Sequence, residues 1–158
     1  MATDRTPARV YRLFRFAVFA ITAIALAYIA SRYSFTEIPT DGLDPELMKG
    51  ERVLVDEWGG AADRLEPGQF VIYDASLDEK RTSLAGEVAA APGGTYPGEA
   101  SDRSRPPVPG LPPDGRVPEG HAVILNGDNS RSDLPDSRIF GPIDVRAIRG
   151  RILARLPF

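Results

Sequence analysis

The chain has 158 residues, no cysteine, a single histidine and a formal net charge of −3. This length is sufficient for one membrane anchor and one compact domain with a hydrophobic core, and it is too short for two ordinary domains. Without cysteine the chain has no disulfide, thiol nucleophile or cysteine-based metal site, and one histidine cannot make a His-rich metal site. We therefore expect neither a metal nor a cofactor.

The N-terminal segment has the pattern of a membrane anchor. Arg5, Arg9, Arg12 and Arg15 precede an uncharged apolar run from residue 16 to residue 30, and Arg32 follows it. At a rise of ~1.5 Å per residue, residues 16–31 cover about 24 Å, and the flanking arginines can snorkel to the surfaces of a hydrocarbon core of about 30 Å. The excess of arginine before the run predicts a cytoplasmic N-terminus.

A cleaved secretory signal is the alternative interpretation of this segment. Cleavage after Ala30 would place Tyr28 at a position where the cleavage motif has a small residue. We therefore expect a basic cytoplasmic N-terminus over residues 1–12, an uncleaved single-pass anchor in the cytoplasmic (inner) membrane over residues 13–32, and an outer domain over residues 36–158.

The outer part of the chain is acidic. Residues 33–158 contain 14 lysines and arginines against 21 aspartates and glutamates. Because nucleic-acid binding needs a basic surface for the phosphates, we expect no nucleic-acid partner.

Short apolar runs between glycine and proline turns predict a mainly β, barrel-like or folded-sheet domain. His121 stands at the start of one of these runs, where a structural strand-end histidine is the preferred interpretation over a catalytic one. The predicted strands are Arg52–Trp58, Gln69–Tyr73, Glu87–Ala91, Ala122–Leu125 and Arg149–Leu156.

Residues 96–119 contain seven of the fifteen prolines and almost no periodic apolar pattern. This composition predicts a surface loop or mobile insertion. A proline-rich recognition motif at residues 105–109 is the alternative, although loop composition explains the prolines without a partner.

A segment that begins at Pro39 resembles the first signature of the signal peptidase I (leader peptidase) family, P-S-x-S-M-x-P-T-L-x-x-G-D-x-x-L-V. Here it is PTDGLDPELMKGERVLV, and the prolines, Leu47, Gly50 and the final Leu-Val match. The resemblance places Gly42 at the position of the serine nucleophile, and glycine has no side chain that could attack a carbonyl. Thr40 falls where the family has an oxyanion-holding hydroxyl.

Two further stretches follow in the family's order. Residues 67–73, PGQFVIY, resemble the second signature and have a structural role. Residues 86–94, GEVAAAPGG, resemble K-R-V-x-x-x-P-G-D, so Gly86 takes the position of the lysine general base, while Glu87 and Gly94 replace the family's arginine and aspartate. The resemblance implies a peptide groove with five candidate residues: Ile38, Pro39, Asp41, Leu84 and Ala85.

The last signature resembles G-D-N-x-x-x-S-x-D-S-R-x-x-G, with one additional residue before Asp136, so the serine that steadies the family lysine could correspond to Ser132 or be lost. The following FGPI leans towards the conjugative-transfer branch of the family. Asp136 and Arg138 suit a structural ion pair, and we expect Gly42 and Gly86 to be adjacent with these loop residues behind them. The signature residues are Gly127, Asp128, Asn129, Asp136, Ser137 and Arg138.

The resemblance implies a membrane-anchored, catalytically inactive homologue that binds, or helps to assemble or process, exported proteins. Its partners would be the membrane, an exported peptide segment, and an active signal peptidase paralogue or a surface-appendage subunit. One alternative is an active leader peptidase with relocated catalytic groups, for which Thr40 and Lys80 are the best candidates and Lys49 is expected to face water. Another is a structural anchor domain with no groove ligand.

Overall fold

The computed structural model describes residues 6–41, 43–57, 65–77, 80–96, 107–127 and 135–156. The chain divides into two compact units, Met1–Tyr33 and Ser34–Phe158.

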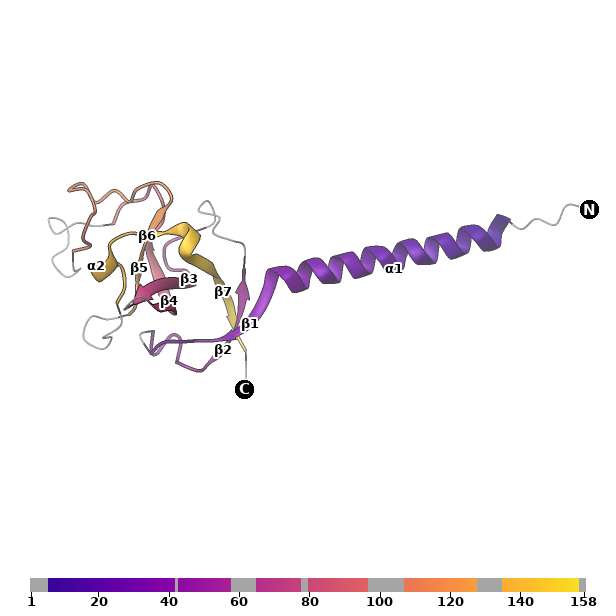
Figure 1. Ribbon diagram of the computed structural model, residues 1–158, viewed down its shortest axis with the longest axis horizontal. Helices are drawn as coiled ribbons and strands as arrows, with labels where there is room; N and C mark the ends of the chain where they lie inside the picture. Colours follow the sequence, from indigo (N-terminus) through magenta and orange to yellow (C-terminus); the bar gives the residue numbers. More distant parts are fainter. Residues whose placement is uncertain are drawn as a thin grey trace, which may run out of the picture. The chain divides into compact units, whose positions relative to one another are not determined.

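The first unit contains one helix, α1, over Thr6–Arg32 (Figure 1). Its 27 residues give a length of about 40 Å, and Val10–Arg32 is long and apolar enough to cross a membrane. A signal sequence would satisfy the same criterion. The helix therefore includes residues 13–32 of the expected anchor. It starts earlier than the expected anchor, since residues 6–12 are also helical.

The second unit is mainly β, as expected, and holds one seven-stranded sheet in the order β1-β2-β7-β3-β4-β5-β6. The described part also contains a short helix, α2, and a single 3-10 turn, η2. The bounds are β1 Tyr33–Glu37, β2 Arg52–Asp56, β3 Phe70–Leu77, β4 Lys80–Ala90, β5 His121–Leu125, α2 Ser137–Phe140, β6 Ile143–Asp144, η2 Val145–Ala147 and β7 Ile148–Arg155.

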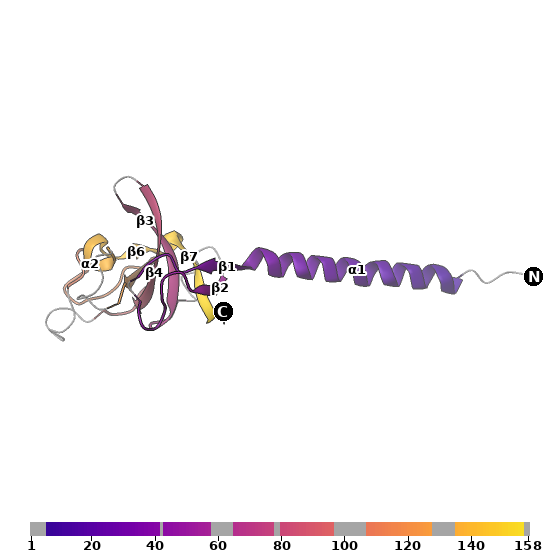
Figure 2. The same cartoon turned by 90° about the horizontal axis from the view of Figure 1, so that it is seen from below.

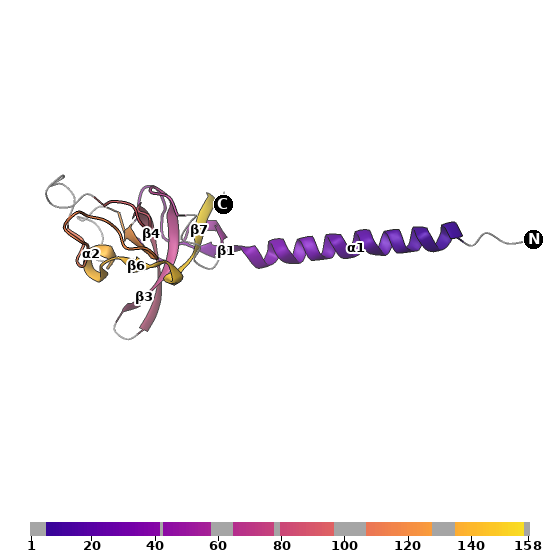
Figure 3. The ribbon, with the colours of Figure 1, turned by 90° about the horizontal axis from the view of Figure 1, so that it is seen from above.

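The expected strand Glu87–Ala91 is only the second half of β4. Residues 80–86 extend it because eight residue pairs, from Phe70 with Glu87 to Leu77 with Lys80, join β3 and β4 as an antiparallel hairpin. Outside this hairpin, β7 pairs with β3 only over Val71–Tyr73, and β5 pairs with β4 only over Glu87–Ala90. The outer half of the hairpin consequently projects from the other strands (Figure 2 and Figure 3).

The two faces of the β3–β4 hairpin enter different parts of the core. Tyr73 and Leu84 belong to one buried cluster with Val88, Ile124 and Ile148, while Ile72 and Ala85 belong to a second cluster with Ile38, Leu43 and Leu47. This division follows from the alternation of side chains along each strand. The segment before β2 thus packs on one face of the hairpin, and the last third of the chain packs on the other.

The interpretation of residues 96–119 as a surface loop is corrected by a third buried cluster. Tyr96, Val108 and Val117 pack with Ala90 and Val123, and the Tyr96 amide donates to the Gly115 carbonyl at 2.9 Å. These apolar residues are too far apart in sequence to make a periodic pattern, so only the tertiary structure reveals that they form core. Residues 97–106, which include the first two of the five residues of the alternative recognition motif, lie outside the described residues.

Candidate functional site

Thr40 of the first motif contacts Ala85, the residue immediately before the third motif and 45 positions later in the sequence. Its side chain is 5% exposed, and Oγ1 accepts a hydrogen bond from the Ala85 amide at 3.3 Å. The segment is held on its other side by Ile38, whose amide donates to the Glu51 carbonyl and whose carbonyl accepts from the Gly50 amide, both at 2.9 Å. The hydroxyl expected at the oxyanion position is therefore fixed beside β4.

Three of the five groove candidates contribute no exposed side chain. Ile38, Leu84 and Ala85 are at most 1% exposed and fill the core. Pro39 is half-buried, and Asp41 points to solvent. Any groove here is consequently made from backbone edges rather than from the side chains that the resemblance suggested.

Gly42 lies outside the described residues, and so do Asp128, Asn129 and Ser132. The expected contact between Gly42 and Gly86 therefore stays a prediction. On the N-terminal side of Gly42, Asp41 makes an exposed ion pair with Lys49, whose Nζ lies 3.2 Å from the carboxylate. On the other side, Leu43 enters the core.

Gly86 is buried, and its surroundings leave no space for a side chain. A Cβ atom at this position would lie 2.5 Å from Ile124 Cγ2, 2.8 Å from Asn126 Oδ1 and 3.1 Å from the Leu125 carbonyl oxygen. Ordinary carbon–carbon contacts are ~3.5–4.0 Å. The glycine is therefore required by close packing, and a lysine could enter only if β5 moved.

Asn126, which is not among the site residues expected from the sequence, fills the space beside Gly86. The residue is fully buried, and its Oδ1 accepts from the Tyr73 hydroxyl at 3.4 Å. Its backbone amide donates to Asp136 Oδ2 at 2.8 Å, and its side-chain amide donates to the Pro135 carbonyl at 3.4 Å. The indication of this role in the sequence is that Asn126 immediately precedes Gly127, the first residue of the last signature.

The ion pair expected between Asp136 and Arg138 is present, with Nη2 at 2.6 Å from Oδ2. Asp136 also caps α2 by accepting from the Arg138 amide at 2.8 Å, and Ser137 Oγ accepts from the Ile124 amide at 2.9 Å. A buried carboxylate needs such partners to remain charged. These contacts hold residues 136–138 behind Asn126, so this described part of the last motif forms a wall against β5.

Tyr73 contributes the one phenol of this network. Burial raises the pKa of its hydroxyl above the ordinary value, the charge of Asp136 raises it further, and the hydrogen bond to Asn126 acts in the opposite direction. At neutral pH the hydroxyl therefore remains a proton donor and takes a structural role.

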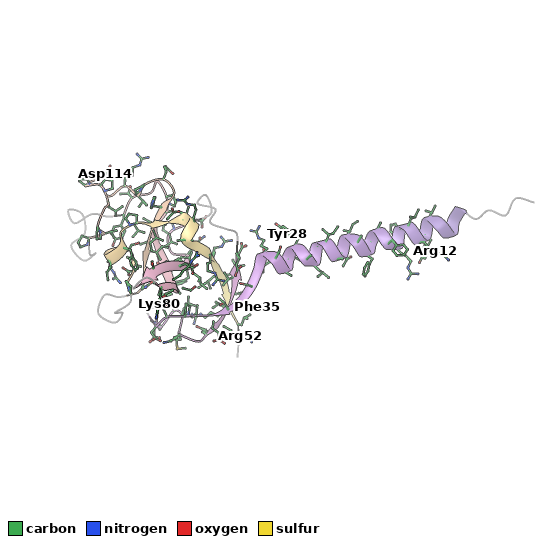
Figure 4. The ribbon with its side chains drawn as sticks, viewed as in Figure 1. Arg12, Tyr28, Phe35, Arg52, Lys80 and Asp114 are labelled. Carbon is green, nitrogen blue, oxygen red and sulfur yellow. The ribbon has the colours of Figure 1, made fainter. Side chains whose placement is uncertain are left out.

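The lysine of the relocated-site alternative lies far from Thr40. Lys80 is the first residue of β4 and is exposed (Figure 4). Five residues separate it from Ala85, which is about 17 Å at the rise of a strand. This geometry does not bring Lys80 together with Thr40.

Residues 81–83 of β4 present an outward edge that no described residue pairs with, which we call the open edge of β4. Because the Ala85 amide points away from β3 to reach Thr40, the antiparallel alternation directs the amides of Ser83 and Arg81 the same way. β5 begins to pair only at Glu87. Among the described residues, none pairs with this part of the edge.

No protein-family model matches the chain, and no curated protein is similar to it. Among the described residues there is also no group of three or more histidine and acidic side chains arranged to hold a metal ion. The functional interpretation therefore depends on the ordered motifs and on the geometry around Thr40, Gly86 and Asn126.

Proposed function

We propose that this protein is a membrane-anchored member of the signal-peptidase-like group that binds an extended segment of an exported protein without cleaving it. The observation that carries the proposal is the open edge of β4, which runs directly into the contact between Thr40 and Ala85. A peptide strand added there would end beside Thr40, along the strand that contains Gly86.

Binding by strand addition fits this edge because it uses backbone groups. The N–H and C=O groups of Arg81 and Ser83 can pair with a peptide backbone while the β3–β4 pairing remains intact. The outer half of the hairpin is polar, and its inner end is fixed by Thr40 and the core. A rigid inner end lowers the ordering cost of binding at the edge.

The absence of cleavage follows from the two catalytic positions. Gly42 and Gly86 offer neither a hydroxyl nor an amine, and the space beside Gly86 is filled by Ile124 and Asn126. Covalent peptide hydrolysis needs a nucleophile and a base within ~3 Å of each other. The fully bonded network of Asn126, Asp136 and Arg138 gives the wall a structural role in place of a catalytic one.

The membrane topology in this proposal places the N-terminus in the cytoplasm and keeps α1 uncleaved, since the arginines cluster before the apolar run. The peptide-binding domain would then lie on the outer face. There it would assist the assembly of exported or surface-appendage proteins, or support an active peptidase paralogue.

The test uses the full chain in lipid nanodiscs and a fluorescent extended peptide with a small-x-small sequence. Fluorescence anisotropy measures binding, and mass spectrometry of the peptide detects cleavage. We expect the wild type to bind the peptide and leave its mass unchanged. Cleavage that is lost in Thr40→Val or Lys80→Ala would instead establish the relocated catalytic site.

A matched pair of proline variants locates the binding edge. Ser83→Pro removes an amide from the open edge of β4, whereas Ser76→Pro removes one from the opposite edge of the same hairpin, and neither amide serves the β3–β4 pairing. Ser83→Ala controls for the side-chain bond to Asp74. Selective loss of binding in Ser83→Pro supports the proposal, and equal binding in both proline variants would contradict it.

A further inference from the structure

The N-terminal turns of α1 carry an unbalanced positive charge. The chain has no acidic residue between Asp4 and Glu37, while Arg9, Arg12 and Arg15 lie in the helix before the apolar run. Among the described residues, no carboxylate pairs with Arg12 or Arg15. An anion that neutralises them must therefore come from outside the helix.

Arg12 and Arg15 share one stripe of α1 with two aromatic residues. The residues 12, 15, 16 and 19 are spaced as i, i+3, i+4 and i+7, which brings them to one face of a helix. Arg12, Arg15, Phe16 and Phe19 line a single hollow on the helix surface. The stripe thus has a cationic end and an aromatic end.

The axial spacing of this stripe matches a phospholipid. Phe16 and Phe19 follow the arginines at the start of the apolar run, and the eight-residue stripe has a length of about 10 Å. If α1 crosses the membrane, the two guanidinium groups lie at the level of the lipid phosphates and the rings lie beside the upper acyl chains. Arginine suits this place because its planar donor group binds phosphate oxygens in pairs.

We propose that this stripe is a binding site for an anionic phospholipid of the leaflet that holds the N-terminus. Arg12 and Arg15 bind the phosphodiester, and Phe16 and Phe19 pack against an acyl chain. The proposal rests on the membrane-spanning α1 of the proposed function. A zwitterionic lipid offers the same phosphate, but its cationic headgroup is repelled by the arginines, so the site discriminates by charge.

The test is native mass spectrometry of the full chain released from nanodiscs of mixed phosphatidylcholine and phosphatidylglycerol. We expect the wild type to retain phosphatidylglycerol in preference to phosphatidylcholine. The double variant Arg12→Gln/Arg15→Gln should lose on the order of ten-fold or more of this retention, because it removes both charges that attract the anionic headgroup. Phe16→Ala/Phe19→Ala should weaken retention through the acyl chain.

The matched control is Arg52→Gln/Arg116→Gln, which removes the same charge from two exposed positions outside α1. Equal retention in the Arg12/Arg15 variant, equal loss in the control, or equal retention of the two lipids by the wild type would overturn the lipid site. A change in dimer content in place of lipid retention would also overturn it. Extraction of the wild type from membranes by alkaline carbonate would contradict the anchor itself, which separates failure of the proposed topology from failure of the lipid site alone.

Discussion

Replacement of Gly86 by alanine tests the close packing around this glycine. The new methyl group would lie 2.5 Å from Ile124 Cγ2 and 2.8 Å from Asn126 Oδ1. Relief of an overlap of about 1 Å in a well-packed core costs ~1–3 kcal/mol. The change from glycine to alanine should by itself raise the free energy of unfolding by ~0.5–1 kcal/mol, because alanine restricts the unfolded chain and suits a strand better than glycine does. The overlap is the larger effect, so we expect net destabilisation of ~1–2 kcal/mol.

The assay is urea denaturation of the full chain in nanodiscs, followed by pulse proteolysis. Glu87→Ala, at the exposed neighbouring position of β4, should change the free energy of unfolding by less than ~0.5 kcal/mol. Gly86→Ala should lower the free energy of unfolding less in the Ile124→Ala background than in the wild type, because Ile124→Ala removes the atom closest to the added methyl group. A neutral or stabilising Gly86→Ala would refute this reasoning and show that position 86 can accept a side chain.

Three further predictions concern the buried polar groups. Tyr73→Phe should reduce the loss of stability at alkaline pH. Because the pKa of Tyr73 is raised in the folded state, the stability that its protonated hydroxyl contributes is complete below the ordinary tyrosine pKa of ~10 and is lost above it, at up to ~1.4 kcal/mol per pH unit. Denaturation at several pH values measures this loss. Asp136→Ala should destabilise the domain by ~3–5 kcal/mol in the same denaturation assay, because Arg138 loses its partner at a site that is largely shielded from water. Thr40→Val should cost ~1–3 kcal/mol by leaving the buried Ala85 amide without an acceptor, while Thr40→Ser should restore most of it.

The strands that could be predicted from sequence are those whose own residues alternate or form an apolar run. β2 and β5 satisfy this condition, as does the first part of β3. The outer half of β4 does not, because its residues 80–83 are polar and become a strand only through pairing with β3. The same limit applies to Tyr96, Val108 and Val117, which are brought into one cluster by tertiary structure.

The sequence predicted one contact of the candidate site and not its packing. Asp136 pairs with Arg138 as expected, whereas the hydrogen bond between Thr40 and Ala85 was not predicted. Sequence could not show that the side chains of Ile38 and Leu84 are core, since an apolar residue in a motif fits a groove or an interior equally well. The role of Asn126 depends on distances across β5 and β4, which a motif does not contain.

Hydrogen–deuterium exchange of the full chain, with and without the extended peptide, tests the central claim most directly. Peptide binding should slow exchange at the amides of Arg81 and Ser83, which face the open edge of β4, while the amides of Thr82 and Leu84, already paired with β3, should change little. The peptide recovered from the same sample should have its original mass. Shortened peptide, or protection confined to other parts of the domain, would contradict a peptide-binding protein without peptidase activity.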